Sequence, residues 1–234
     1  MLRVGCAGFP VARERYWREL SFVEADTGGR MPRERTLAQW REGAPEGAEF
    51  AVQASRLITH GPEDRGFPAA GRVLSAARRP MCGGFRDSLE VHEAWGATLA
   101  AVRALRASWM VLETPASFRP GPDRLRDMYR SLRAVARPVG VEFVWQPRGE
   151  WPADLARRVC AELGLVLAVD PLREPPPERG RLYFRVGAGR IAPLSVEELS
   201  TIRRAAAGRP AVVALSHRAA FSDARNLSRA ERGS

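Results

Sequence analysis

The amino-acid sequence predicts a single (β/α)₈ barrel whose active site, if it has one, lies where the barrel strands end. Short apolar runs alternate with amphipathic helical stretches along the whole chain, which is typical of a parallel sheet with helices outside it. The chain has 234 residues, and one such barrel takes about 250. An open doubly wound sheet would show the same alternation, but eight strand–helix units in this length favour closure. No Gly-x-Gly-x-x-Gly follows an early strand, which disfavours a dinucleotide-binding fold.

The expected strands are short and rich in apolar residues. They occupy residues 2–7, 20–25, 49–54, 109–113, 139–145, 165–170, 182–186 and 211–215. The expected helices occupy residues 11–19, 34–42, 88–107, 122–135, 152–163, 195–207 and 218–229. Together these elements describe one domain over residues 1–234.

Three of the helices carry clear local signals. In 88–107 the apolar residues recur at helical spacing and form one face. Helix 152–163 opens with a proline, which the first turn of a helix tolerates. Helix 195–207 opens with Ser195, and Glu198 follows three residues later, so the pair predicts a capping box.

Three segments are expected to be irregular. Residues 171–180, PLREPPPERG, hold too many prolines for a helix, so the barrel is predicted to lack the helix after its sixth strand. Residues 55–87 are rich in Gly, Pro and Arg and are expected to form a long loop near the barrel mouth. The arginine-rich tail, residues 225–234, is expected to fray.

The charge of the chain is unusual. The formal net charge is +10, and every basic residue other than the three histidines is arginine, because the sequence contains no lysine. Complete exclusion of lysine favours coding bias in a GC-rich genome as the reason for the arginine choice. Arginine also binds phosphate bidentately, so the positive excess favours a phosphate-bearing partner, nucleic acid included.

The remaining bulk features point to a cytoplasmic protein with no membrane partner. No apolar run approaches the roughly 18 residues of a membrane span, and the N-terminal segment enters a strand pattern at once, so no signal peptide is predicted. Cys6, Cys82 and Cys160 are too few and too scattered for a disulfide framework or a zinc knuckle.

Polar residues recur where the predicted strands end, which is where such barrels carry their chemistry. Glu24, Glu142 and Asp170 lie within or at the end of apolar runs, and burying a carboxylate is costly unless it is paired, hydrogen-bonded or metal-bound. We interpret these three acids and His217 as candidate acid–base residues around Arg185, which would hold a phosphate. The alternative is that they form helix caps and ion pairs lining the barrel.

Further residues near the strand ends are candidates for substrate binding. They are Asp26, Gln53, Trp145, Gln146 and Ser216. Aromatic residues at a barrel mouth can stack on bases or sugars, but more often they plug the rim. The carboxylates suit Mg²⁺ or Mn²⁺, which prefer oxygen ligands, although no ligand spacing here is diagnostic.

The order of motifs resembles the domain-of-unknown-function 72 family, also called the YecE-like proteins. The most specific match is PEGAEFAVQA at residues 45–54, followed by Ile-Thr-His at 58–60. Other matches run in order along the chain: VGCAGF at 4–9, FVEAD at 22–26, ETPASF at 113–118, VEFVW at 141–145 and YFRVG at 183–187.

This resemblance implies a TIM barrel but no established reaction. The barrels of the family are similar to those of endonuclease IV and sugar isomerases, which suggests phosphate-containing or sugar ligands by analogy. Several polar positions of the family differ here: Gln53 replaces a lysine, Val144 replaces an arginine, and Ser216-His217 replaces Asn-Asn. Glu24, Glu142, Asp170 and Arg185 remain.

Three functions stay open. The first is a hydrolase acting on a phosphodiester or phosphorylated substrate such as nucleic acid, with an acidic residue as general base or as ligand of an activating metal. The second is a non-catalytic module that binds nucleic acid or a protein partner. The third, sugar isomerase or lyase chemistry, fits the barrel but leaves the positive charge unexplained.

Overall fold

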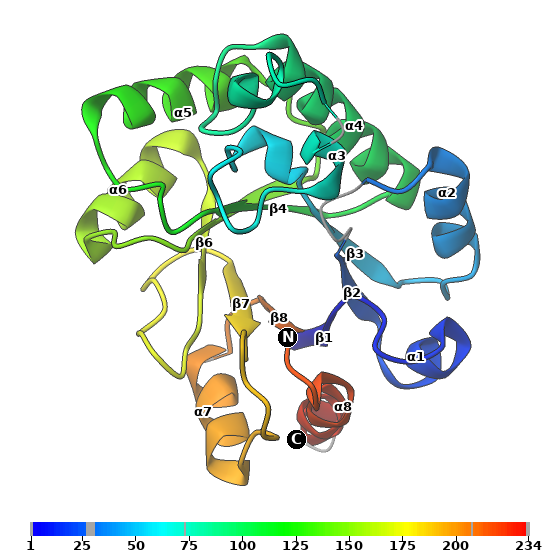
Figure 1. Ribbon diagram of the computed structural model, residues 1–234. Coiled ribbons are helices and arrows are strands. Elements are labelled where there is room, and N and C mark those ends of the chain that lie inside the picture. Colours follow the sequence, from blue (N-terminus) through cyan, green and yellow to red (C-terminus); the bar gives the residue numbers. More distant parts are fainter. Residues whose placement is uncertain (1, 27–30, 73, 207, 233–234) are drawn as a thin grey trace.

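A computed structural model describes residues 2–26, 31–72, 74–206 and 208–232, in which eight parallel strands close into a barrel in chain order (Figure 1). The strands are β1 (Leu2–Ala7), β2 (Phe22–Ala25), β3 (Glu49–Gln53), β4 (Trp109–Thr114), β5 (Glu142–Pro147), β6 (Val166–Val169), β7 (Leu182–Val186) and β8 (Ala211–Leu215). Hydrogen bonding between β1 and β8 closes the ring. The predicted (β/α)₈ barrel is therefore confirmed.

Helices pack around the outside of this barrel. They are α1 (Arg13–Glu19), α2 (Glu34–Glu42), α4 (Leu89–Leu105), α5 (Pro122–Ala134), α6 (Ala153–Leu163), α7 (Val196–Ala206) and α8 (Ala220–Arg232). The capping box of α7 is confirmed, because Ser195 N donates to Glu198 Oε2 (2.8 Å) and Glu198 N donates to Ser195 Oγ (3.1 Å). α8 continues to Arg232, so helix covers most of the tail for which we expected fraying.

The barrel interior is a packed core. Phe22, Trp109 and Tyr183 fill its lower part, with ring centroids 5.3 Å apart for Trp109 and Tyr183 and 6.3 Å apart for Phe22 and Tyr183. Trp109 Nε1 donates to Glu49 Oε1 (2.7 Å), which satisfies the indole inside the barrel. These rings leave no room for a ligand at their level of the barrel interior.

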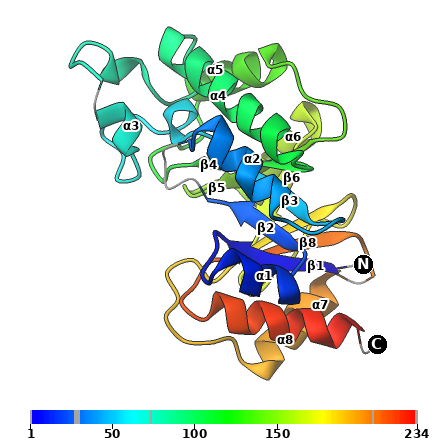
Figure 2. The ribbon, with the colours of Figure 1, turned by 90° about the vertical axis from the view of Figure 1, so that its right-hand side faces the viewer.

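Two irregular segments shape the barrel mouth. No helix follows β6 in residues 171–180, as the prolines predicted. The long segment between β3 and α4 contains η1 (Arg56–Ile58), α3 (Ala69–Arg72) and η2 (Arg79–Met81). Figure 2 shows α3 projecting past the carboxyl ends of the strands, on the side of the barrel that carries α4 and α5.

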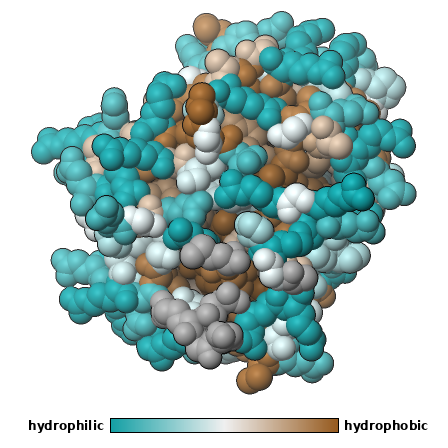
Figure 3. All heavy atoms as spheres, turned by 180° about the vertical axis from the view of Figure 1, so that it is seen from behind, coloured by the Kyte–Doolittle hydropathy of each residue, from teal (hydrophilic) through white to brown (hydrophobic). Residues whose placement is uncertain are grey.

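The opposite end of the barrel holds the amino ends of the strands. Figure 3 shows this face, where hydrophilic residues cover most of the surface and apolar side chains are visible between them. Within the described part of the chain, no helix combines the length and apolar character needed to cross a membrane.

Candidate functional site

Five strands each place a polar side chain in one layer at the top of the barrel interior. Each of these residues lies two positions beyond an interior core residue, so it points to the same side of its strand. The core residues are Phe22, Ala51, Val111, Val144 and Tyr183, and the polar residues that follow them are Glu24, Gln53, Glu113, Gln146 and Arg185. Closure of the sheet therefore brings together groups that are far apart in sequence.

Arg185 is the centre of this layer. Its Nη2 donates to Glu24 Oε1 (2.7 Å), and its Nη1 donates to Glu113 Oε2 (2.8 Å) and to Gln146 Oε1. The second oxygen of Glu24 accepts from the Tyr183 hydroxyl (2.9 Å). Four strands thus fix one buried guanidinium.

Glu113 carries more positive neighbours than any other acid of this layer. Besides Arg185, its carboxylate faces Arg148 (3.2 Å) and Arg56 (3.6 Å). Burial alone raises the pKa of Glu113, but the attraction of Arg185 and Arg148 outweighs burial and lowers that pKa to about 2. For Arg185, burial lowers the pKa, while Glu24 and Glu113 raise it well above its ordinary value. Both groups are therefore charged at every physiological pH.

A cavity of about 300 Å³ opens beside this network, between the ends of β5, β6 and β7, the start of α6 and the segment after β6. Four arginines line it: Arg148, Arg157, Arg173 and Arg185. Gln146 and Trp151 also line it, and its acidic residues are Asp170 and Glu174. The absence of a helix after β6 leaves Pro175 and Pro177 as its outer wall.

Among the predicted substrate-binding residues, Arg185 and Gln146 line the cavity, and Gln53 lies in the polar layer beside them. Gln146 contacts Arg185 and lines the cavity. Gln53 lies in the polar layer, 2% exposed, and its Oε1 has no hydrogen-bond partner among the described residues. Ser216 follows β8, is exposed, and donates through Oγ to the Val186 carbonyl (3.4 Å). Asp26 is exposed just beyond β2, and residues 27–30 after it lie outside the described part.

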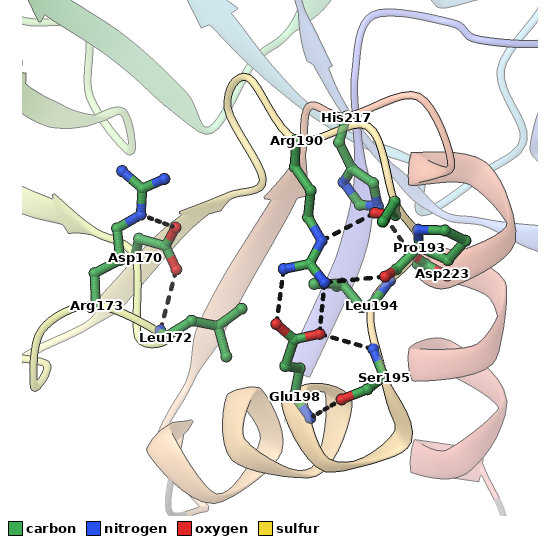
Figure 4. Close-up of polar contacts among 11 residues, drawn as sticks. Asp170, Leu172, Arg173, Arg190, Pro193, Leu194, Ser195, Glu198, His217 and Asp223 are labelled. Atoms are coloured by element: carbon green, nitrogen blue, oxygen red, sulfur yellow. Dashed lines mark hydrogen bonds and ion pairs between the residues drawn. The ribbon is translucent and has the colours of Figure 1, made fainter.

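Asp170 follows β6 and lies on the wall of the cavity, as expected for a residue at a strand end. Figure 4 shows its two contacts: Oδ1 accepts from Leu172 N (3.1 Å), and Oδ2 pairs with Arg173 Nε at 3.5 Å. The carboxylate is therefore oriented locally and faces the same space as the arginines.

The expectation that Glu142 lies at the barrel mouth is wrong. β5 begins at Glu142, in register with Trp109 at the start of β4, so this acid lies at the amino end of the barrel. It pairs there with Arg181 at 3.5 Å. We predicted a strand over 139–145, but Val139 and Gly140 form a turn, and Gly140 has a φ of +77°. The strand consequently starts three residues later and ends at Pro147.

Trp145 points away from the barrel interior, so its predicted role in substrate binding is also wrong. It lies one residue after Val144, whose side chain faces inward, and alternation turns it toward the helices. Its ring is fully buried edge-on against Trp151 (4.8 Å), and Nε1 donates to Thr114 Oγ1 (3.2 Å).

His217 does not face the mouth cavity. Its side chain is fully buried, and Nε2 lies 2.7 Å from Asp223 Oδ2 on α8 (Figure 4). The same carboxylate oxygen accepts from Leu194 N (2.8 Å). Gly187 lies directly beneath the ring, because a Cβ on it would come within 2.5 Å of His217 Nδ1. Asp223 thus joins α8 both to His217 and to the segment before α7, so His217 has a structural role.

The acid that our selection of site residues omitted is Glu113. It ends the fourth predicted strand with Thr114 and Pro115, so its position near the mouth was visible in the sequence. The sequence did not show that Glu113 contacts Arg185, because that depends on the inward direction of Val111 and Glu113 in β4. The sequence likewise did not show that Arg148, one residue past β5, pairs with Glu113.

The acidic residues of the mouth do not fit Mg²⁺ or Mn²⁺. In the described part of the chain, no three His, Cys, Asp or Glu residues lie close enough together to hold a metal ion. The oxygens of Glu24 and Glu113 are already engaged by cationic or hydroxyl donors. We therefore assign no step to a divalent metal.

Comparison with protein families gives a match over residues 12–162 to the family described as "Protein of unknown function DUF72". The chain belongs to the DUF72 family. The match spans the signature at 45–60 and strands β2–β5, so the resemblance inferred from the motifs is confirmed. No curated protein matches the chain.

Solved structures of DUF72 proteins share the whole fold. One from Enterococcus faecalis superposes with a TM-score of 0.68 at 13% identity, over 100% of this chain and 98% of its own. One from Thermotoga maritima gives 0.65 at 14% identity, over 99% of each chain. Endonuclease IV from Thermus thermophilus gives 0.53 at 15% identity, over 100% of this chain and 96% of its own. At these identities the likeness concerns the fold.

Proposed function

We propose that this DUF72 protein binds a phosphate-bearing ligand in the arginine-lined cavity at the barrel mouth. The observation that carries the proposal is the convergence of Arg148, Arg157, Arg173 and Arg185 on one cavity at the carboxyl ends of the strands. Binding sites of (β/α)₈ barrels lie at this end, and phosphate sites there are frequent. Arginine is the side chain best suited to bidentate contact with phosphate oxygens.

The four arginines differ in how deeply they are buried. Arg185 is buried and held by Glu24 and Glu113, so its guanidinium is fixed at the inner end of the cavity. The side chains of Arg148, Arg157 and Arg173 are 37%, 44% and 73% exposed, so they keep the freedom to turn their donors to a ligand. A preorganised charge surrounded by adjustable donors fits a compact anion.

The ligand is proposed to be bound rather than hydrolysed, because the acids nearest Arg185 are not available for proton transfer. Glu24 is fully buried and accepts from Arg185 and Tyr183. The low pKa of Glu113 makes it a very weak base. Both acids therefore act on the ligand through the arginines that they hold.

Calorimetric titration of the full chain with inorganic phosphate, AMP and a short single-stranded oligonucleotide tests the proposal. We expect AMP to bind at low salt with a salt-dependent Kd. The double variant Arg148→Gln/Arg173→Gln should weaken binding by about tenfold or more, since charge-assisted contacts to phosphate each contribute on the order of 1.5–3 kcal/mol.

The double variant Arg119→Gln/Arg126→Gln is the matched control, because it removes the same number of charges. Arg126 pairs with Asp123 on the surface at 2.8 Å and does not line the cavity. Arg119 pairs with Glu150 on the surface at 3.7 Å and does not line the cavity. Equal loss of affinity in the control and in Arg148→Gln/Arg173→Gln would show that phosphate follows the general positive charge of the chain, and the proposed site would be abandoned.

Hydrolysis of a phosphodiester, with Asp170 as general base, is the second candidate. It is favoured by the position of Asp170 on the wall of the same cavity and by the similarity of the barrel to that of an endonuclease IV. Asp170→Asn should then remove hydrolysis of a nucleic-acid substrate while ligand binding persists, and Glu174→Gln should leave hydrolysis intact. If the wild-type chain shows no turnover when the ligand is saturating, hydrolysis is excluded and only the binding function remains.

A further inference from the structure

A second cavity lies on the outside of the barrel, between α4 and α5, which run side by side in Figures 1 and 2. Its volume is about 360 Å³, and it shares no lining residue with the mouth cavity. Most of its wall is apolar and includes Trp95, Leu99, Ala134 and Val135. Charged residues also line it: Arg86, Asp87 and Arg130.

Gly96 is exposed and lines this cavity. It lies in the middle of α4, where glycine weakens a helix relative to alanine. Its φ is not in the left-handed region that favours glycine, and a Cβ added to it would meet no atom within 4 Å. Neither backbone conformation nor close packing therefore excludes a side chain, but a large one would fill the cavity.

The polar groups of the cavity favour an anionic ligand. Asp87 pairs with His92 at 3.1 Å, and its contact with Arg130 is long, at 4.0 Å. Arg86 donates to the carbonyls of Cys82 and Gly83, which holds its guanidinium in place. The lining thus contains two arginines and one aspartate, which leaves one positive charge in excess.

The apolar wall favours a flat ligand body. Trp95, which is 6% exposed, donates through Nε1 to Ser131 Oγ (2.9 Å), so the polar edge of the indole is already satisfied and the residue adds an apolar part to the wall. We propose that this cavity binds one small organic anion that has a flat apolar body, such as an aromatic carboxylate or sulfonate. The volume lies within the range of about 300–1,000 Å³ found for small-molecule sites.

The test uses the fluorescent dye 8-anilinonaphthalene-1-sulfonate with the native full chain, together with the uncharged dye N-phenyl-1-naphthylamine. We expect saturable binding of one sulfonate dye per chain, insensitive to added inorganic phosphate. Gly96→Leu should weaken binding of both dyes by about tenfold or more, because the new side chain occupies the space of the apolar body. Arg130→Gln should weaken binding of the sulfonate about threefold and change binding of the uncharged dye less.

Two control variants separate this effect from general changes of the surface. Ala97→Leu adds the same side chain to an exposed position of α4 that does not line the cavity, and Arg133→Gln removes a charge one turn beyond Arg130. Both should bind the dyes as the wild type does.

Unchanged affinity in Gly96→Leu, or an equal loss in Ala97→Leu, would overturn the proposal. Dye-dependent dimerisation in sedimentation velocity would overturn it as well, because the cavity would then be a contact between two copies of the chain. The result is independent of the mouth cavity, since inorganic phosphate competes there and not here.

Discussion

The two ends of the barrel carry the same pair of residue types in different surroundings. At the mouth, Glu24 and Arg185 lie 2.7 Å apart with side chains that are 0% and 8% exposed. At the amino end, Glu142 and Arg181 lie 3.5 Å apart with side chains that are 39% and 45% exposed. Removing one partner of a buried pair is strongly destabilising, because the other charge is left buried without a partner. An exposed pair adds little stability.

The neighbours of the two pairs differ as well. Arg185 also contacts Glu113 and Gln146, and further arginines surround the cavity beside it. Arg181 instead lies over the ring of Trp109 at 4.3 Å, where the aromatic plug closes the barrel. The difference teaches that burial joins the pair at the mouth into an interior network, while the exposed pair at the amino end covers the core.

The largest expected effect comes from breaking the buried pair. Arg185→Ala leaves Glu24 without its cationic partner in the barrel interior, so the free energy of unfolding should fall by about 3–5 kcal/mol. Urea denaturation at pH 7 measures this change. A loss below about 1 kcal/mol, the usual size for an exposed pair, would erase the distinction between the two ends.

The next effect concerns the pH dependence of stability. The pKa of Glu113 is about 2 in the folded chain, against an ordinary value of 4.5, so its contribution is complete above pH 4.5 and is lost as the pH falls toward 2. The shift corresponds to about 3 kcal/mol. Glu113→Gln should therefore flatten the stability profile in that range, measured by urea unfolding at several pH values. An unchanged slope in the variant would contradict this assignment.

A smaller effect in a neighbouring pH range comes from His60, in the segment beside the mouth. Burial, reinforced by Arg56, lowers its pKa from 6.5 to about 4. The unfolded chain then binds more protons between these values, so stability falls as the pH drops from 6.5 to 4. By the conversion used for Glu113, the loss is at most about 3 kcal/mol. His60→Asn should remove this slope. The loss of stability below pH 4.5 that comes from Glu113 should persist in this variant.

The smallest effect is expected at the amino end. Glu142→Gln removes one exposed ion pair, so the free energy of unfolding should change by less than about 1 kcal/mol. Phosphate affinity should stay at the wild-type value, because Glu142 does not line the mouth cavity. A loss of phosphate binding in this variant would return Glu142 to the candidate site and contradict the distinction between the two ends of the barrel.

Much of the architecture was predictable from the sequence. Strand–helix alternation, chain length and the absence of a dinucleotide motif predicted the closed barrel, and the predicted bounds of β7, β8 and α2 agree with the structure. The prolines of 171–180 predicted the missing helix, and Ser195 with Glu198 predicted the cap of α7. These features depend on local backbone preferences, which neighbouring residues determine.

Only the tertiary structure decided which polar groups meet. Strands of a parallel barrel are buried on both faces, so their hydropathy does not show which alternate residues point inward. Trp145 and Gln146 are neighbours in the sequence, yet one faces the helices and the other contacts Arg185. A start of β5 three residues later than expected moved Glu142 to the far end, and the inward direction of Glu113 brought it to the centre of the site. The sequence by itself determined the barrel and the supply of charged residues. Closure and register, which depend on contacts across the whole ring, decided which of those residues share a cavity.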